Sequence, residues 1–134
     1  MNRRYMLDTN VLSHIMQGRD GDLLARLIQV PVGLAVISSV TLAELEYGLQ
    51  RKGQSVRLRN ALTQVLLRMD VLPWDEQAAS CYGGFCFGLE TKGINLSDFD
   101  MMIAAHAVAV NAILVSRDKA FAQISEPGFR LEIW

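Results

Sequence analysis

Four acidic residues in separate parts of the chain have the chemistry of a metal site: Asp8, Glu44, Asp100 and Asp118. Their carboxylate oxygens, with no histidine or cysteine at ligand spacing, suit Mg²⁺ or Mn²⁺ better than zinc. Carboxylates gathered in one place raise one another's pKa unless a cation neutralises them. A bound divalent ion would offset that repulsion and would activate water for hydrolysis of a phosphodiester bond.

The positions of these acids along the chain favour such a gathering. Asp8 follows a short apolar run at 5–7, and Asp118 follows another at 112–115. Glu44 and Asp100 fall in the opening turns of helices expected over 38–49 and from 97 or 98 to about 110. In a parallel sheet the carboxyl ends of the strands and the starts of the following helices share one edge, where ligands bind. We therefore expect one acidic crevice.

The sheet itself is predicted from alternating strand and helix patterns. Strands are expected at 5–7, 34–37, 71–72, 112–115 and 129–133, the third of them short. Helices are expected over 11–16, 23–28, 38–49, 56–69, 75–92 and 98–110. Because strands alternate with helices, the fold class is α/β with a mostly parallel sheet.

Each acid also has an ordinary structural explanation. Thr41 and Glu44 have the spacing of a capping box, in which the glutamate folds back on the threonine amide. Asp98 and Asp100 are favourable near a helix N-terminus through the macrodipole alone. Turn or cap positions explain the other two acids. From the residues alone, the metal site and the four separate caps both stay open.

Composition limits the class of protein. The chain has 134 residues, 51% of them apolar, and 14 acidic side chains against 13 basic ones. A chain of this length buries an adequate core as one domain over 1–134, so Cys81 and Cys86 are expected to be reduced. Asp8 interrupts any signal peptide, and the longest apolar tract, 101–115, is shorter than the roughly 20 residues of a membrane span. We expect a cytoplasmic protein without a membrane partner. The near-zero charge disfavours an extended nonspecific grip on nucleic acid but permits a small local site.

Several sequence motifs together resemble the PIN domain, and more narrowly the VapC-type toxins of bacterial type II toxin–antitoxin pairs. The resemblance covers essentially the whole chain. It implies a PIN-like three-layer α/β/α sandwich with a mostly parallel five-stranded sheet. The motifs are Met-Leu-Asp-Thr-Asn at 6–10, Ser-Ser-Val-Thr-Leu-Ala-Glu-Leu-Glu-Tyr-Gly at 38–48, Asp-Met-Met-Ile-Ala-Ala-His-Ala at 100–107, Leu-Val-Ser-Arg-Asp-Lys-Ala-Phe at 114–121 and the closing tryptophan.

The resemblance also implies an activity: a Mg²⁺-dependent endoribonuclease, with Mn²⁺ as a substitute, that leaves a 5′-phosphate and a 3′-hydroxyl. The partners it implies are an RNA substrate, a cognate antitoxin that neutralises the toxin, a homodimer and a toxin–antitoxin hetero-oligomer. Asp8, Glu44, Asp100 and Asp118 match the family's acidic positions. Asp8 and Asp100 are then the principal metal ligands, and the other two complete the site or position water. Asp98 adds a charge beside the site or caps the helix.

Other residues have two interpretations each. Thr9, Asn10 and Ser116 are expected to orient Asp8, a metal-bound water or a phosphate, and Asn10 and Ser116 suit turn and cap positions equally well. Arginines and a lysine between residues 51 and 68 would position RNA or form a solvated helix face. Arg117, next to Asp118, is a better candidate than this basic segment for touching the scissile phosphate. His106 is expected to be a structural, hydrogen-bonded histidine.

Aromatic and apolar side chains have the same ambiguity. Core packing is the default for four aromatic residues that could otherwise stack on bases, namely Tyr47, Trp74, Tyr82 and Phe85. The helices expected over 11–16 and 23–28 could present an apolar groove to an antitoxin segment. Its residues would be Leu12, Ile15, Met16, Leu24, Leu27 and Ile28.

Two rival functions come from other classes of protein. An aspartyl-phosphate phosphotransferase would use Asp8 as a covalent nucleophile, but Asn10 stands where a second aspartate is expected. A partner-binding PIN-like or receiver-like module without turnover remains the alternative. Such a module, lacking the acidic site, would show no carboxylate-dependent Mn²⁺ binding.

Overall fold

Five parallel strands form the centre of the molecule. The structure is a computed structural model and describes residues 3–134. The strands are β1 (Tyr5–Leu7), β2 (Ala35–Ser38), β3 (Asp70–Leu72), β4 (Ile113–Ser116) and β5 (Leu131–Ile133). Their order in the sheet is β3-β2-β1-β4-β5, and every neighbouring pair runs parallel. The predicted α/β class and five-stranded parallel sheet are confirmed.

Six α-helices and one 3₁₀ helix connect these strands in the described part of the chain. The helices are α1 (Thr9–Gln17), α2 (Gly21–Gln29), α3 (Ser39–Arg51), α4 (Val56–Leu66), α5 (Glu76–Thr91), α6 (Asp98–Ala109) and the 3₁₀ helix η1 (Lys119–Gln123). All six predicted helices are present. The short η1 was not predicted, because its five residues lack a long amphipathic period.

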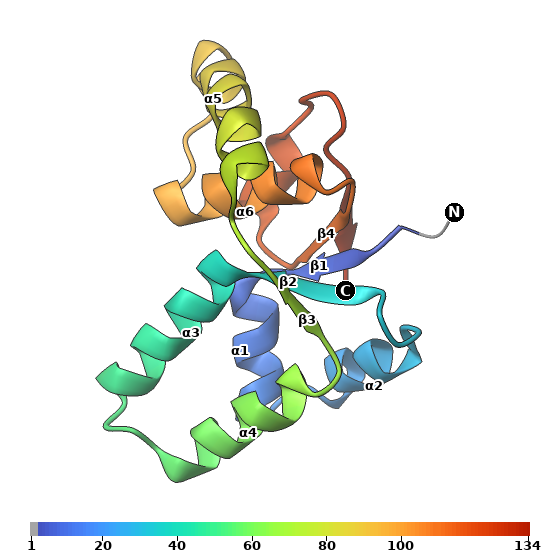
Figure 1. The fold of residues 1–134 in the computed structure, drawn as a ribbon, viewed down its shortest axis with the longest axis vertical. Helices are drawn as coiled ribbons and strands as arrows, with labels where there is room; N and C mark the ends of the chain where they lie inside the picture. Colours follow the sequence, from blue (N-terminus) through green and yellow to red (C-terminus); the bar gives the residue numbers. More distant parts are fainter. Residues whose placement is uncertain (1–2) are drawn as a thin grey trace.

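The helices form two layers around the sheet. Figure 1 shows α1 to α4 on one side and α5 and α6 on the other. Alternate residues of a strand point to opposite faces, so each strand contributes to both cores. Leu7 and Val115 pack into the core under α1 to α4, while Met6 and Leu114 pack into the core under α5 and α6. The predicted three-layer arrangement is confirmed.

Helix caps at the carboxyl edge of the sheet fix where the helices begin. Asp8 caps α1, Ser38 caps α3 and Ser97 caps α6, each by accepting a backbone N–H bond through its side chain. Because α3 starts at Ser39, Thr41 is already inside the helix, and the suggested capping box between Thr41 and Glu44 is wrong. Ser97 likewise occupies the cap position proposed for Asp98.

Core packing is confirmed for three of the four aromatic residues. The Phe85 side chain is buried. Trp74 lies against Tyr82 and donates its indole N–H to the carbonyl of Met102 at 3.0 Å. Tyr47 is the exception, because 64% of it is exposed. Cys81 and Cys86 are free thiols, as expected.

Two further predictions concern apolar surfaces. Most residues of the suggested apolar groove lie in the core, and only Leu24 and Ile28 of α2 are exposed. Among residues 3–134, no helix is both long and apolar enough to cross a membrane.

Candidate active site

Acidic residues from four elements lie around the carboxyl edge of the sheet. Asp8 directly follows β1, and Asp118 follows β4, which is the neighbouring strand with Leu7 opposite Val115. Asp100 lies in the first turn of α6, and Glu44 lies in α3. The parallel topology therefore brings residues from both ends of the chain to one place, as the sequence pattern predicted.

Asp8 is held rigidly at the centre of this edge. The residue is only 3% exposed. Oδ1 accepts the backbone N–H of Val11 at 2.9 Å, and Oδ2 accepts the hydroxyl of Ser116 at 2.5 Å. The Ser116 oxygen in turn accepts the backbone N–H of Asp118 at 2.9 Å. One hydroxyl thus ties the carboxylate after β1 to the chain that leaves β4.

Electrostatics show that three of the acids interact. Burial raises the pKa of Asp8, against the lowering effect of the bonds from Ser116 and Val11, and the carboxylates of Asp100 and Asp118 raise it further. Burial also raises the pKa of Asp100, where the Asp118 carboxylate again adds to the effect and the bond with Ser97 opposes it. The ionised site is under mutual repulsion, which a bound cation would relieve.

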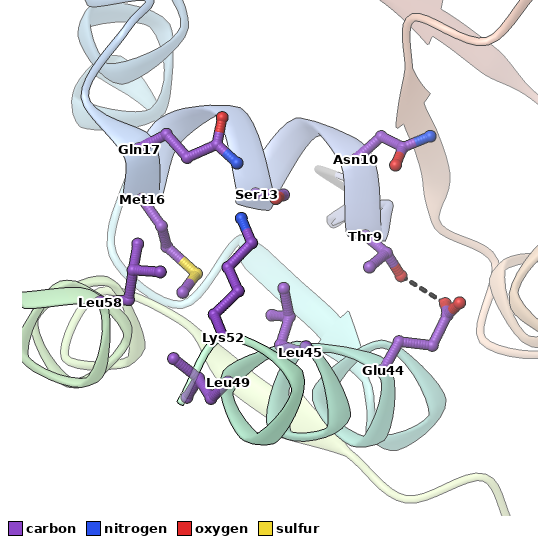
Figure 2. A pocket seen from close by; sticks show the side chains of 11 residues that line it. Thr9, Asn10, Ser13, Met16, Gln17, Glu44, Leu45, Leu49, Lys52 and Leu58 are labelled. Carbon is purple, nitrogen blue, oxygen red and sulfur yellow. Dashed lines mark hydrogen bonds between the residues drawn. The ribbon is translucent and has the colours of Figure 1, made fainter. Parts of the chain in front are cut away.

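Glu44 reaches the same edge through Thr9. The hydroxyl of Thr9 donates a hydrogen bond of 2.6 Å to Oε1 of Glu44, as Figure 2 shows. Since Thr9 is the residue after Asp8, this bond holds the α3 carboxylate beside the start of α1. Thr9 was expected to orient Asp8 or a water, but the structure places its hydroxyl on Glu44.

The donor set fits a hard divalent cation. All the side chains brought to this edge offer carboxylate or hydroxyl oxygen, which Mg²⁺ and Mn²⁺ prefer. Within residues 3–134, no three His, Cys, Asp or Glu side chains form a ready-made metal cage. Mg²⁺ commonly keeps several waters and takes only one or two protein carboxylates, so an open acidic edge suits it better than a closed cage.

Comparison with known proteins places this site in a family. The sequence model of the family described as PIN domain matches residues 5–127. The chain belongs to the PIN-domain family. It is 32% identical to Ribonuclease VapC2 of Rickettsia felis over 132 residues, which are 97% of each chain. It is 32% identical to the tRNA(fMet)-specific endonuclease VapC of Shigella flexneri over 132 residues, 98% of each chain.

A solved structure supports the same assignment for this PIN domain. VapBC2 from Rickettsia felis, bound to a DNA fragment from its promoter, matches with a TM-score of 0.87 and 30% identity. The match covers 97% of this chain and 98% of that chain. The predicted resemblance to PIN domains of the VapC type is confirmed.

Two arginines of this PIN domain, Arg117 and Arg59, form ion pairs with carboxylates. The Arg117 guanidinium forms an ion pair with Asp20 at 2.6 Å and donates to the carbonyl of Trp134 at 2.7 Å. These contacts hold the chain after β4 to the C-terminus and to the start of α2. Arg117 therefore has a structural role, and the phosphate contact predicted for it stays a prediction. In the basic segment, Arg59 pairs with Glu46 at 2.6 Å.

The histidine of α6, His106, has the structural role predicted for it. His106 Nδ1 lies 2.8 Å from the hydroxyl of Ser38, and both side chains are buried. Burial lowers the pKa of His106, with the Asp75 carboxylate opposing that effect. The contact joins α6 to the end of β2 at the level of the α3 cap.

Two hollows of the PIN domain border the Thr9–Glu44 hydrogen bond. One, of about 130 Å³, lies between α1, α3 and α4 and includes Asn10, Ser13 and Lys52. Figure 2 shows Lys52 reaching from the end of α3 toward α1. The other hollow, of about 550 Å³, includes Tyr47, Arg51 and Phe99. Phe99 was not singled out from the sequence, although its place directly before Asp100 was a usable signal.

Proposed function

We propose that this PIN domain is a Mg²⁺-dependent endoribonuclease toxin that a cognate antitoxin neutralises. The observation that carries the proposal is the convergence of Asp8, Asp100 and Asp118 at one sheet edge, with the Asp8 carboxylate fixed by Ser116. The names of the relatives, which are ribonucleases, and the solved VapBC complex support it.

The acids have distinct tasks in this proposal. Asp8 and Asp100 would hold the ion, because both are partly shielded from water and repel each other when ionised. Bound Mg²⁺ supplies charge stabilisation at the phosphate and a water of lowered pKa. Thr9 occupies Oε1 of Glu44, which leaves Oε2 to orient the attacking water. Asp118 completes the negative edge.

Hydrolysis by water accounts for the expected products. The water oxygen attacks phosphorus, the bond to the 3′-oxygen breaks, and that oxygen takes up a proton. The products are a 5′-phosphate and a 3′-hydroxyl. No histidine is needed as the general base, since His106 is buried against Ser38 and His14 lies exposed on α1.

Partners follow from the same assignment. We expect an RNA substrate, an antitoxin bound in a hetero-oligomer, and a homodimer of this chain, all in the cytoplasm. Sedimentation of the purified chain alone and with the product of an adjacent small reading frame tests both assemblies. A monomer at micromolar concentration would contradict the homodimer.

A cleavage assay tests the activity. The probe is end-labelled bulk tRNA, chosen because one relative is named a tRNA(fMet)-specific endonuclease. We expect cleavage with Mg²⁺ or Mn²⁺, none with EDTA, and none by Asp100→Asn, which keeps its cooperative unfolding transition. Asp98→Asn is the matched control, because Asp98 is exposed in the same helical turn.

The outcome also separates the rival function. Equal cleavage by the wild type and Asp100→Asn would contradict the site, and cyclic phosphate ends would contradict water as the nucleophile. A binding module without turnover would cleave none of a panel of cellular RNAs and would show no Mn²⁺ binding that depends on Asp8 or Asp100 in isothermal titration.

A further inference from the structure

Two exposed aromatic side chains stand beside the acidic edge. Tyr47 of α3 is 64% exposed and Phe99 of α6 is 51% exposed. Both line the hollow of about 550 Å³, which also reaches Thr9 and Glu44. Tyr47 lies three residues after Glu44 on α3, and Phe99 precedes Asp100, so each aromatic ring is carried by the same helix as an acid of the site.

We propose that this hollow is a nucleobase subsite, in which a base next to the scissile phosphate stacks on Tyr47 and Phe99. The inference rests on the proposed ribonuclease function and adds to it the part of the RNA that the protein grips. Aromatic rings stack on any base, because every base has a π-face. A single exposed aromatic side chain needs no explanation, but two around one hollow beside an acidic site are typical of a ligand site.

Arg51 gives the hollow a positive charge where the acids would repel RNA. Its guanidinium carbon lies 5.6 Å from the centre of the Tyr47 ring. This cation–π contact holds the arginine over the ring and leaves its N–H donors able to meet a phosphate. A ligand that combines flat bases with anionic phosphates matches this pair better than an apolar protein segment does.

Gly48 lines the hollow and leaves open space beside it. The residue lies inside α3, where glycine destabilises a helix relative to alanine. Its backbone is not in the left-handed region, and a Cβ built there would meet no atom within 4 Å. Neither the helix nor the packing requires glycine here. A side chain at this position would instead occupy space that a base could use.

The test compares two fluorescent probes by anisotropy. One is a 12-nucleotide oligouridylate, and the other has the same ribose-phosphate backbone with every base replaced by hydrogen. Asp100→Asn is the background, so that the probes stay intact. We expect Tyr47→Ala and Phe99→Ala each to weaken binding of the base-bearing probe about tenfold and to leave the abasic probe unchanged.

Matched variants distinguish stacking from a general surface effect. Tyr47→Phe should retain binding, because the ring is kept. Phe87→Ala should change nothing, since Phe87 is 67% exposed on α5 and lines no part of this hollow. Gly48→Leu should weaken only the base-bearing probe while the helix content, followed by circular dichroism, is preserved. This variant tests the subsite even where removal of an aromatic side chain disturbs folding.

Other outcomes overturn the subsite. Equal affinity for the two probes, or equal losses for both in the aromatic variants, would show that bases are not held here. If Tyr47→Ala and Phe99→Ala dissociate a dimer in sedimentation without altering base discrimination, the surface is a contact between copies. Cleavage of RNA without base discrimination refutes only the subsite, whereas base discrimination without cleavage by the wild type refutes only the ribonuclease.

Discussion

The Ser116 hydroxyl donates a hydrogen bond of 2.5 Å to Oδ2 of Asp8, although the two residues are 108 positions apart in the chain. The same oxygen accepts the backbone N–H of Asp118 at 2.9 Å. Ser116 therefore links two neighbouring strands and the acids that follow them.

Ser116→Ala removes both bonds and leaves the buried Asp8 carboxylate without one donor. We expect the free energy of unfolding at pH 7 to fall by about 1–3 kcal/mol, the cost of an unsatisfied buried polar group. We also expect RNA cleavage to fall. Urea unfolding measures the first effect. Ser80→Ala, an exposed substitution on α5, is the control and should stay within about 0.5 kcal/mol. An unchanged stability in Ser116→Ala would contradict the linking role.

Asp100→Asn should raise the free energy of unfolding in metal-free buffer at pH 7. Burial raises the folded-state pKa of Asp8 and Asp100 above that of the unfolded chain, with further contributions between the carboxylates. A raised carboxyl pKa means that the folded state binds the proton more tightly. The contribution of these two carboxyls to stability is therefore greatest below the unfolded pKa, near 4, and is lost as pH rises through the folded pKa.

Urea unfolding at pH 4.5 and pH 7 in EDTA checks this prediction. Mg²⁺ should stabilise the wild type through binding to the folded state and should have a smaller effect on Asp100→Asn. Asp98→Asn should show neither the gain nor the altered response to Mg²⁺. The prediction fails if Asp100→Asn is less stable than the wild type at pH 7.

The hydrogen bond from Thr9 to Glu44 predicts energetic coupling between α1 and α3. Thr9→Val keeps the shape of the side chain and removes the 2.6 Å bond. In a double-mutant cycle with Glu44→Ala, which removes the acceptor oxygen, we expect a coupling of about 1 kcal/mol in the free energy of unfolding. In the cleavage reaction, Thr9→Val should lower kcat and change KM less, because Glu44 would no longer be held for the attacking water.

Thr63→Val provides the control for this cycle, since the exposed Thr63 hydroxyl donates only to the carbonyl of Arg59 within its own helix. A coupling near zero between Thr9 and Glu44, with normal kcat in Thr9→Val, would show that the bond neither stabilises the fold nor orients the carboxylate.

His106 predicts a loss of stability in mild acid. Burial lowers the pKa of His106, so the folded state binds a proton there less tightly than the unfolded chain, which binds it below pH about 6.5. Because the unfolded state then carries more protons, the free energy of unfolding falls as pH decreases through that range. His106→Asn keeps a polar atom for Ser38 and removes the titration.

Urea unfolding between pH 5.5 and 7.5 measures the slope. Compared with the wild type, His106→Asn should have a flatter dependence, whatever its absolute stability. His14→Asn should keep the wild-type slope, because His14 is exposed on α1. The opposing contribution of the acidic edge is common to all three proteins and is removed by the comparison. Parallel slopes for the wild type and His106→Asn would contradict the prediction.

Local patterns were enough to predict the strands, the six α-helices and the parallel sheet. The spacing of apolar residues and the turn residues reflect interactions between neighbours in the chain, so they can be recognised without a structure. The placement of Asp8 after β1 and of Asp118 after β4 followed from the same patterns. Choosing between a cap and a site residue was harder. Asp8 turned out to cap α1 while also lying in the acidic edge, so those two interpretations do not exclude each other.

The sequence by itself thus determined the order of the elements, the edge of the sheet to which the acids belong, and the donor chemistry they offer. Tertiary structure alone decided the partners: Ser116 for Asp8, Thr9 for Glu44, and Asp20 for Arg117. It also decided that Tyr47 stays exposed and faces the same hollow as Phe99. Such pairings depend on strand register and on how helices pack across layers, and these are set by the whole core rather than by neighbouring residues.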